Sequence, residues 1–117
     1  MEDDKLSPSE QAALDYHRTN LALGQGMKNA DGSMTTFKGA VVGVDGKHMI
    51  LPTYWHGQVR SIPEAMRFAI RSGIPFPSYK TPEQALQAEQ KIHKLMEQDM
   101  VDYMSRQPQQ GMQNEGM

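Results

Sequence analysis

At 117 residues the chain has the length of one domain and is too short for two ordinary ones. Hydrophobic residues make up 38% of it and aromatic residues 7%, and the absence of cysteine excludes disulfides and thiolate metal sites. The formal net charge is −2, and no apolar run approaches the roughly 20 residues of a membrane-spanning helix, so we expect neither a membrane span nor a secretory signal.

The first predicted element is a helix that begins at Ser7. The run Ser7-Pro8-Ser9-Glu10 has the form of a capping box, with proline at the first helical position. Gly24 is typical of the end of this helix. Because its apolar stripe is thin, we expect the helix to lie on the core rather than to form it; the stripe consists of Ala12, Ala13, Tyr16 and Leu23.

Residues 35–55 carry the strongest local signal in the chain. Two β-rich runs, residues 35–44 and 47–55, flank Asp45-Gly46, a pair typical of the two-residue type I′ turn. Residues 58–60 are a candidate third short strand. The turn predicts a register in which one face of the hairpin is apolar and packs on a helix, with the pairs Val44–Lys47, Val42–Met49 and Ala40–Leu51.

Two further helices are predicted, each with its own cap. Ser61-Ile62-Pro63-Glu64 is a second capping box, and Gly73 is typical of the helix end about three turns later. Residues 74–77 alternate apolar residues with proline, which predicts an extended linker. Thr81-Pro82 opens a third helix, which meets no glycine or proline before Pro108 and can therefore run for about 26 residues, or about 39 Å. Its second half is longer than so small a domain can bury, so we expect it to project.

These elements predict an α+β fold in which an antiparallel hairpin, or a sheet of three short strands, packs on two or three helices. The last helix is expected to be long and projecting. Residues 1–34 are predicted to be an N-terminal helix followed by a Gly-rich loop, residues 35–105 to be the α+β core with the long helix, and residues 106–117 to be a flexible tail.

No motif for catalysis or for metal binding is present in the sequence. The four histidines do not recur at i,i+3 or i,i+4 and none lies in an HExxH motif, so we expect surface or hydrogen-bonded side chains; they are His17, His48, His56 and His93. No Gly-x-Ser-x-Gly nucleophile elbow is present either. We therefore predict a binding or assembly protein, not an enzyme, with no cofactor and no metal.

Two groups of side chains in the middle of the chain are candidates for binding. Tyr54 and Trp55 could form an aromatic tip that contacts a partner or a nucleic-acid base, although covering the small core is the favoured interpretation of Trp55. Residues 38–80 carry a formal charge of +4 between two segments of −3 each. Within this basic segment Arg60, Arg67 and Arg71 are candidate anion-binding residues. The alternative is that these charges belong to an ordinary solvated surface, because the whole chain is not basic.

Methionine is abundant, with ten residues in the chain. Met96, Met100 and Met104 recur every fourth residue on the predicted last helix, next to Tyr103. Methionine is flexible and polarizable, which suits an adaptable interface, and filling gaps in the core is the alternative. Because this part of the helix is expected to project, we favour an interface with a partner or with copies of the chain, formed by Met96, Met100, Tyr103 and Met104.

Residues 37–53, FKGAVVGVDGKHMILPT, resemble a segment of tailed-bacteriophage virion proteins. In that family a strand, a turn and an (I/L)-(I/V/L)-P-T strand precede an S-x-x-E-A helix, a glycine, an aromatic residue and a helix opened by T-x-E-x-A. The resemblance covers about residues 35–97, and the matching residues here are Ile50-Leu51-Pro52-Thr53, Ser61-Ile62-Pro63-Glu64-Ala65, Gly73, Phe76 or Tyr79, and Thr81-Pro82-Glu83-Gln84-Ala85.

The resemblance implies a hairpin-plus-two-helix module of internal or ejection-associated virion proteins, and it brings no catalytic residues. We therefore expect a phage structural or assembly protein that is made in the bacterial cytoplasm, resides in the virion, and binds other virion proteins or itself through its last helix. The alternative is a small phage-encoded protein that acts on nucleic acid or on a host enzyme, supported by the basic centre and by Tyr54 and Trp55.

Overall fold

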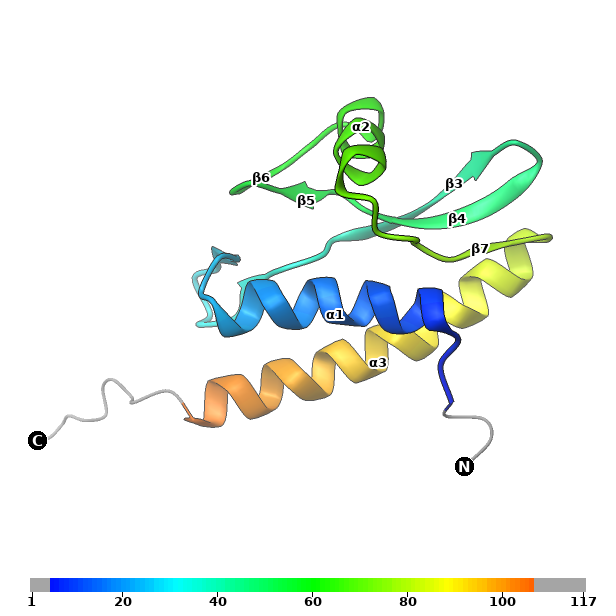
Figure 1. Ribbon diagram of the computed structural model, residues 1–117. Helices are drawn as coiled ribbons and strands as arrows, with labels where there is room; N and C mark the ends of the chain where they lie inside the picture. Colours follow the sequence, from blue (N-terminus) through cyan, green and yellow to red (C-terminus); the bar gives the residue numbers. More distant parts are fainter. Residues whose placement is uncertain (1–4, 107–117) are drawn as a thin grey trace, which may run out of the picture.

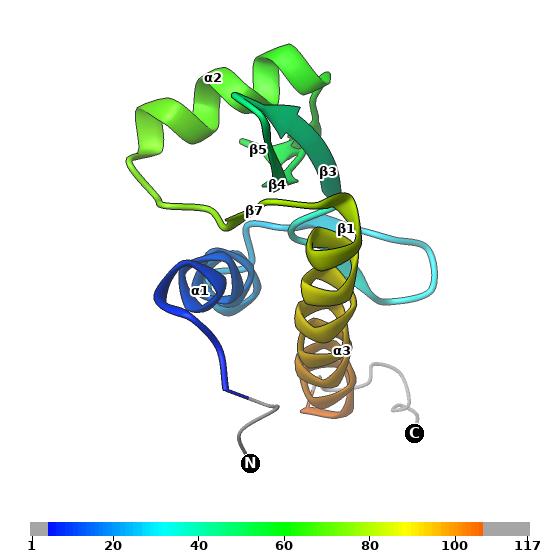
Figure 2. The same cartoon turned by 90° about the vertical axis from the view of Figure 1, so that its right-hand side faces the viewer.

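Three layers make up the computed structural model, which describes residues 5–106 (Figures 1 and 2). Helix α2 (Ile62–Ser72) lies on one side of a small antiparallel sheet, and helices α1 (Pro8–Ala22) and α3 (Pro82–Arg106) lie beside each other on the other side. This arrangement confirms the predicted α+β class with a long last helix. No helix among the described residues is long and apolar enough to cross a membrane.

The central strand of the sheet is β4 (Lys47–Pro52), which pairs with β3 (Gly39–Val44) on one side and with β7 (Ser78–Tyr79) on the other. Both pairings are antiparallel. Asp45 and Gly46 have φ angles of 52° and 76°, as a type I′ turn requires. The predicted register is confirmed, with the pairs Val44–Lys47, Val42–Met49 and Ala40–Leu51.

The third strand of this sheet is not the one that we expected from residues 58–60. Strand β6 (Gln58–Val59) pairs instead with β5 (Tyr54–Trp55) in a separate two-stranded sheet. The third strand is β7, which directly follows the proline-containing segment predicted to be a linker. A two-residue pairing leaves no periodic pattern in a sequence, so only the tertiary structure reveals it. A further short pair, β1 (Met27–Lys28) with β2 (Met34–Thr35), lies in the Gly-rich loop.

The helix ends follow the predicted caps. In α1 the Glu10 N–H donates to Ser7 Oγ at 3.2 Å, and the Ser7 N–H donates to Glu10 Oε1 at 3.0 Å. The same reciprocal box joins Ser61 and Glu64 at the start of α2. Gly73 follows α2 with a φ angle of 72°, the left-handed conformation that ends many helices.

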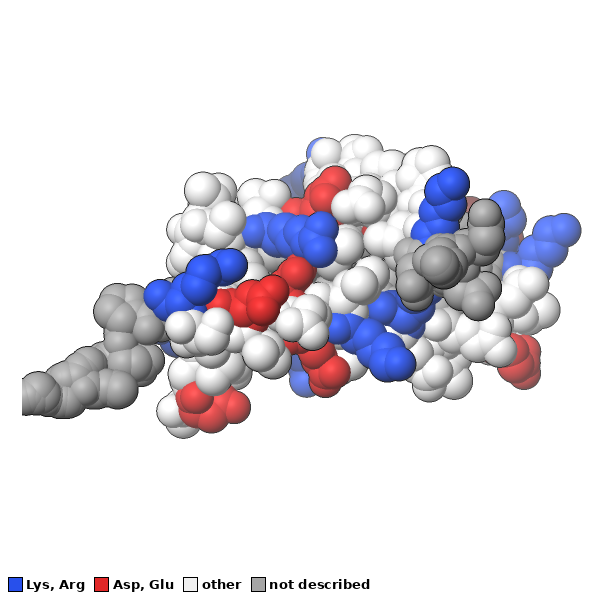
Figure 3. Space-filling model, turned by 90° about the horizontal axis from the view of Figure 1, so that it is seen from below, with Lys and Arg blue, Asp and Glu red and all other residues white. Residues whose placement is uncertain are grey.

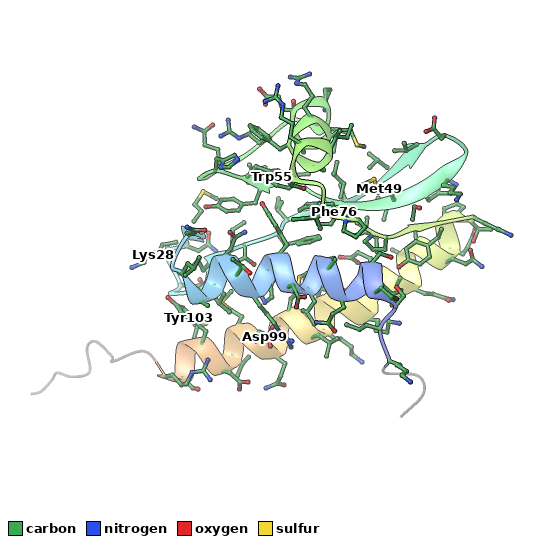
Figure 4. The ribbon with its side chains drawn as sticks, in the orientation of Figure 1. Lys28, Met49, Trp55, Phe76, Asp99 and Tyr103 are labelled. Carbon is green, nitrogen blue, oxygen red and sulfur yellow. The ribbon has the colours of Figure 1, made fainter. Side chains whose placement is uncertain are left out.

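The core of the protein is an aromatic cluster around Trp55, which is 4% exposed. The Trp55 ring lies 4.7 Å from the Tyr16 ring, 5.9 Å from Phe68 and 6.1 Å from Phe76, measured between ring centroids. Its indole N–H donates to the Pro52 carbonyl at 2.8 Å, so the buried polar atom is satisfied. Figure 4 shows Trp55 and Phe76 in the layer between α1 and α2.

Helix α1 belongs to this core, which corrects the expectation that it only lies on it. Ala13 is part of the hydrophobic cluster, and Leu14 is 2% exposed. The predicted apolar stripe omitted the buried Leu14 and Leu21 and included Leu23, which is 64% exposed. The buried face also contains two hydrogen-bonded polar residues. The residues that α1 buries are Glu10, Ala13, Leu14, His17 and Leu21.

The second half of α3 does not project freely, because α1 lies along it (Figure 1). The two helices run in the same direction, since Glu10 pairs with Lys91 and, further along both, Arg18 pairs with Asp99. The opposite side of this half remains exposed, with Val101 at 60% exposure. Apart from Arg106, the tail expected at residues 106–117 lies outside the described residues.

Candidate partner-binding groove

Met96 and Met100 line a groove of about 390 Å³ that opens between α3 and residues 33–39. Ile50 and Ile92, which are 1% and 2% exposed, lie at its floor. Polar side chains stand around this apolar centre, among them Ser33, Lys38, Glu89, His93 and Glu97. We call this hollow the methionine groove.

Helical spacing explains one wall of the methionine groove. Ile92, Met96 and Met100 are four residues apart, so their side chains lie on the same side of α3. The other wall is the segment from β2 to the start of β3, which contributes Met34 and Phe37. Walls that contain three methionines can change shape to fit an apolar side chain, because methionine has flexible torsions and a polarizable sulfur.

A buried polar network fixes the two walls relative to α1. His17, which is 1% exposed, lies with Nδ1 2.5 Å from Thr36 Oγ1 and Nε2 3.2 Å from Asp99 Oδ2. Arg18 donates to the same carboxylate from Nε at 2.8 Å and from a terminal nitrogen at 3.3 Å. Asn20 Nδ2 donates to the Thr36 carbonyl at 2.9 Å. In Figure 4 Asp99 points from α3 toward α1.

The protonation of His17 follows from its surroundings. Burial is the largest influence and lowers the pKa of His17; the Asp99 carboxylate raises it, Arg18 lowers it, and the net pKa is lowered. In the neutral ring that satisfies both neighbours, the Thr36 hydroxyl donates to Nδ1 and the Nε2–H donates to Asp99. Arg18 supplies a positive charge beside the Asp99 carboxylate, so all hydrogen bonds of the network form with His17 neutral and without a proton on Nδ1.

A hydroxyl, an imidazole and a carboxylate that are hydrogen-bonded in this order also occur in catalytic triads. Here Thr36 is 5% exposed, and Asp99 is paired with a guanidinium that competes with the imidazole for its charge. We therefore assign the network the role of joining α1, residues 33–39 and α3. The sequence did not predict this network, because His17 and Asp99 are 82 residues apart. In the sequence, the seven-residue spacing of Glu10 and His17 could only have indicated that two polar side chains share one face of α1.

A second polar junction joins α1 to α3 and to β7. Glu10 accepts a hydrogen bond from the Tyr79 hydroxyl at 2.6 Å and pairs with Lys91 Nζ at 3.1 Å. Burial raises the pKa of Glu10, but the hydrogen bonds from Tyr79, Ser7 and Lys91 together outweigh it and the net pKa is lowered. Burial and the neighbouring Glu10 raise the pKa of Tyr79. The junction thus holds a carboxylate at a nearly buried position.

Tyr54 and Trp55 lie in the interior and do not form a surface tip. They are 2% and 4% exposed, and the Tyr54 hydroxyl donates to the Gln25 carbonyl at 2.6 Å. Both line a different hollow, of about 900 Å³, between α1, the β5–β6 pair and residues 72–75. The interpretation of Tyr54 and Trp55 as an exposed aromatic tip is therefore corrected, and Trp55 covers the core as the favoured interpretation had it.

The remaining residues predicted to bind a partner lie near the end of α3. Tyr103 is half-buried beside Leu21 of α1, and it points toward α1 in Figure 4. Met104 is 36% exposed and lies close to Gly32 in the loop between β1 and β2. Neither Tyr103 nor Met104 lines the methionine groove. Of the four residues predicted to form the interface on the last helix, the structure therefore brings only Met96 and Met100 together in the groove.

The three candidate anion-binding arginines have different surroundings. Arg60 donates from Nε to the Trp55 carbonyl at 3.0 Å, and its guanidinium lies 5.2 Å from the centre of the Phe68 ring. Arg67 and Arg71 are exposed on α2. On the face formed by α1 and α3, basic and acidic residues are interspersed (Figure 3). Among residues 5–106 no cluster of three or more histidine or acidic residues could hold a metal ion.

No protein-family model, curated protein or solved structure matches this chain. The methionine groove and the exposed surfaces are therefore the structural observations that bear on function.

Proposed function

We propose that the chain is a non-enzymatic bacteriophage virion structural or assembly protein that binds a larger particle component through the methionine groove. Met96 and Met100 carry the proposal, because both are half-buried over an apolar floor and both face an opening at the surface. The phage assignment is supported by the resemblance of residues 37–53 to a segment of tailed-phage virion proteins.

The proposed occupant of the groove is the apolar side of a helix from the partner. A volume of about 390 Å³ lies at the lower end of the range of about 300 to 1,000 Å³ that binding pockets span. An apolar centre with a polar rim is also the usual composition of an energetic hot spot between proteins. One or two large apolar side chains of an amphipathic helix would fit such a site.

The test is incorporation of a Met100→Lys variant into particles. A charged group at a site that a partner desolvates costs a large part of the binding energy, so we expect the copy number per particle to fall by about tenfold or more. Leu86→Lys is the matched control, because Leu86 is an apolar residue of α3 that is 52% exposed and does not line the groove. Copies per particle are measured by quantitative mass spectrometry of purified virions.

Two results would contradict the proposal. Equal incorporation of both variants would exclude the methionine groove, and absence of the unmodified chain from purified particles would favour the alternative of a protein that acts on nucleic acid or on a host enzyme. A thermal melt of Met100→Lys separates lost binding from lost folding. Point substitutions are preferable to truncation of α3, because a chain ending before Asp99 would also lose the network with His17 and Arg18.

A further inference from the structure

Strand β3 is an edge strand that lacks the usual protection of such strands. It stands at the end of the β3-β4-β7 order, and no strand formed within residues 5–106 pairs with its outer edge. Its six residues, GAVVGV, include no proline and no charge, and Val41 is 38% exposed. Edge strands of natural proteins are normally protected by charges, proline, bulges or a covering element.

The backbone groups that face this open edge follow from the pairing with β4. Across a two-residue turn, Val44 and Lys47 exchange both hydrogen bonds, and such pairs then alternate along the hairpin. The Ile50 N–H donates to the Pro77 carbonyl at 2.9 Å, away from Val41, which shows the alternation directly. Outward-facing N–H and C=O groups therefore belong to Gly39, Val41 and Gly43.

These three residues are arranged symmetrically about Val41. If a second β3 approaches antiparallel, with Val41 opposite Val41 of the second copy, then Gly39 lies opposite Gly43 in both directions. Each of these pairs can exchange two N–H···O bonds, so every outward-facing group finds a partner. The glycines add no side chain beside Val41. A Cβ at Gly43 would meet no atom within 4 Å, whereas one at Gly39 would lie 2.9 Å from the Phe37 ring, so the edge is open at Gly43 and Gly39 leaves room only for backbone.

The same register matches the charges at the two ends of the strand. It brings the end of one strand, which Lys38 precedes, to the end of the other, which Asp45 follows. Lys38 has a φ angle of 50°, so the ladder between the copies begins at Gly39. Both Lys38 and Asp45 are exposed, and the twofold symmetry repeats the opposite-charge contact at the other end. Between these ends the facing residues are valine, alanine and glycine, which pair without a buried charge.

From this geometry we infer that the outer edge of β3 binds a second copy of the chain. The two sheets join into one continuous antiparallel sheet in the order β7-β4-β3-β3-β4-β7, with a twofold axis through the Val41 pair. A twofold contact of this kind uses the same surface on both copies and closes on itself, so it does not propagate into a fibre. Lys38 and Gly39, at one end of this edge, also line the methionine groove, whereas Val41 and Gly43 do not. The inference does not depend on the proposed function.

Sedimentation velocity of the full chain tests the inference between roughly 10 μM and 1 mM, the range of a weak dimer. We expect concentration-dependent dimers of the unmodified chain and monomers of Val41→Lys, in which two ammonium groups would face each other on the axis. Val41→Thr is the matched control and should dimerise, because threonine keeps the β-branched shape and the backbone donor. Circular dichroism of Val41→Lys checks that the hairpin still folds.

Hydrogen exchange provides a second, residue-level readout. Protection of the Val41 and Gly43 amides should rise with protein concentration, whereas the Val42 and Val44 amides should be protected at every concentration by their bonds to β4. A monomer throughout the range would overturn the inference. A dimer that Val41→Lys leaves intact would also overturn it, and a dimer lost in Met100→Lys instead would place self-association in the methionine groove. If β3 bound an extended peptide of another protein and no dimer formed, the partner of this edge would be that protein and not a second copy of the chain.

Discussion

At the scale of single residues, His17 makes the stability of the molecule depend on pH near neutrality. Its ring is buried, and its two nitrogens are satisfied by Thr36 and Asp99 when the ring is neutral. Because its pKa is lowered from 6.5 in the folded chain, the unfolded chain binds the proton more tightly. The contribution of His17 to stability is therefore complete above about pH 6.5 and is lost as the pH falls below that value.

We predict that the free energy of unfolding declines between about pH 7.5 and pH 5.5, and that His17→Gln removes this part of the decline. The substitution should also cost about 1–3 kcal/mol at neutral pH, because it breaks buried hydrogen bonds. Urea titrations at both pH values measure the two effects. The control is His93→Gln, which removes an exposed histidine outside the buried network. Equal pH dependence in all three proteins would contradict the assignment.

Trp55 is the residue whose environment the sequence left most open. It is the single tryptophan of the chain, and its contacts with Tyr16 of α1 and Phe68 of α2 join two layers of the molecule. Its burial also ends the interpretation of Tyr54 and Trp55 as an exposed binding tip. A short aromatic pair has no periodicity that would distinguish a core position from a surface one, so the sequence could support both.

At the scale of secondary-structure elements, α1 determines whether the fold is one unit. Its buried face contacts α3, and a leucine within the helix differs sharply in burial from one just after it. Leu14 is 2% exposed, whereas Leu23, which directly follows the helix, is 64% exposed. A peripheral helix would tolerate changes at both positions equally.

We predict that Leu14→Ala destabilises the protein by about 2–5 kcal/mol, because it opens a cavity in the contact between α1 and α3. Leu23→Ala should change the stability by no more than about 0.5 kcal/mol, as expected for an exposed site. Chemical denaturation followed by circular dichroism measures both values. A small effect of Leu14→Ala would indicate that α1 contributes little to the core.

The capping boxes and the Asp45-Gly46 turn are the elements that sequence reasoning predicted correctly and in detail. Each depends on residues within three or four positions of one another, such as Ser7 with Glu10 and Val44 with Lys47. Strand β7 was missed because its partner, β4, lies about 30 residues away and the pairing covers only two residues. Prolines at positions 75 and 77 further indicated a linker.

At the scale of the whole molecule, the three layers share one core, so they should unfold together. The Trp55 ring contacts side chains from α1, from α2 and from the segment before β7. We predict that tryptophan emission shifts to longer wavelength in the same transition in which the helical circular dichroism is lost. The folded chain should resist quenching by acrylamide, because Trp55 is 4% exposed. Two separate transitions would show that the helices and the aromatic cluster are distinct units.

The sequence by itself determined the parts of this protein that depend on neighbouring residues: where the helices begin, where α2 ends, and how β3 and β4 pair. Capping and turn formation act over a few residues and therefore leave recognisable patterns. Only the tertiary structure decided that Met96 and Met100 line a groove while Tyr54 and Trp55 are buried, and that His17 meets Asp99 and Glu10 meets Lys91. The reason is physical: burial of a side chain depends on which distant segment packs over it, and a single polar residue facing another 82 positions away produces no local pattern.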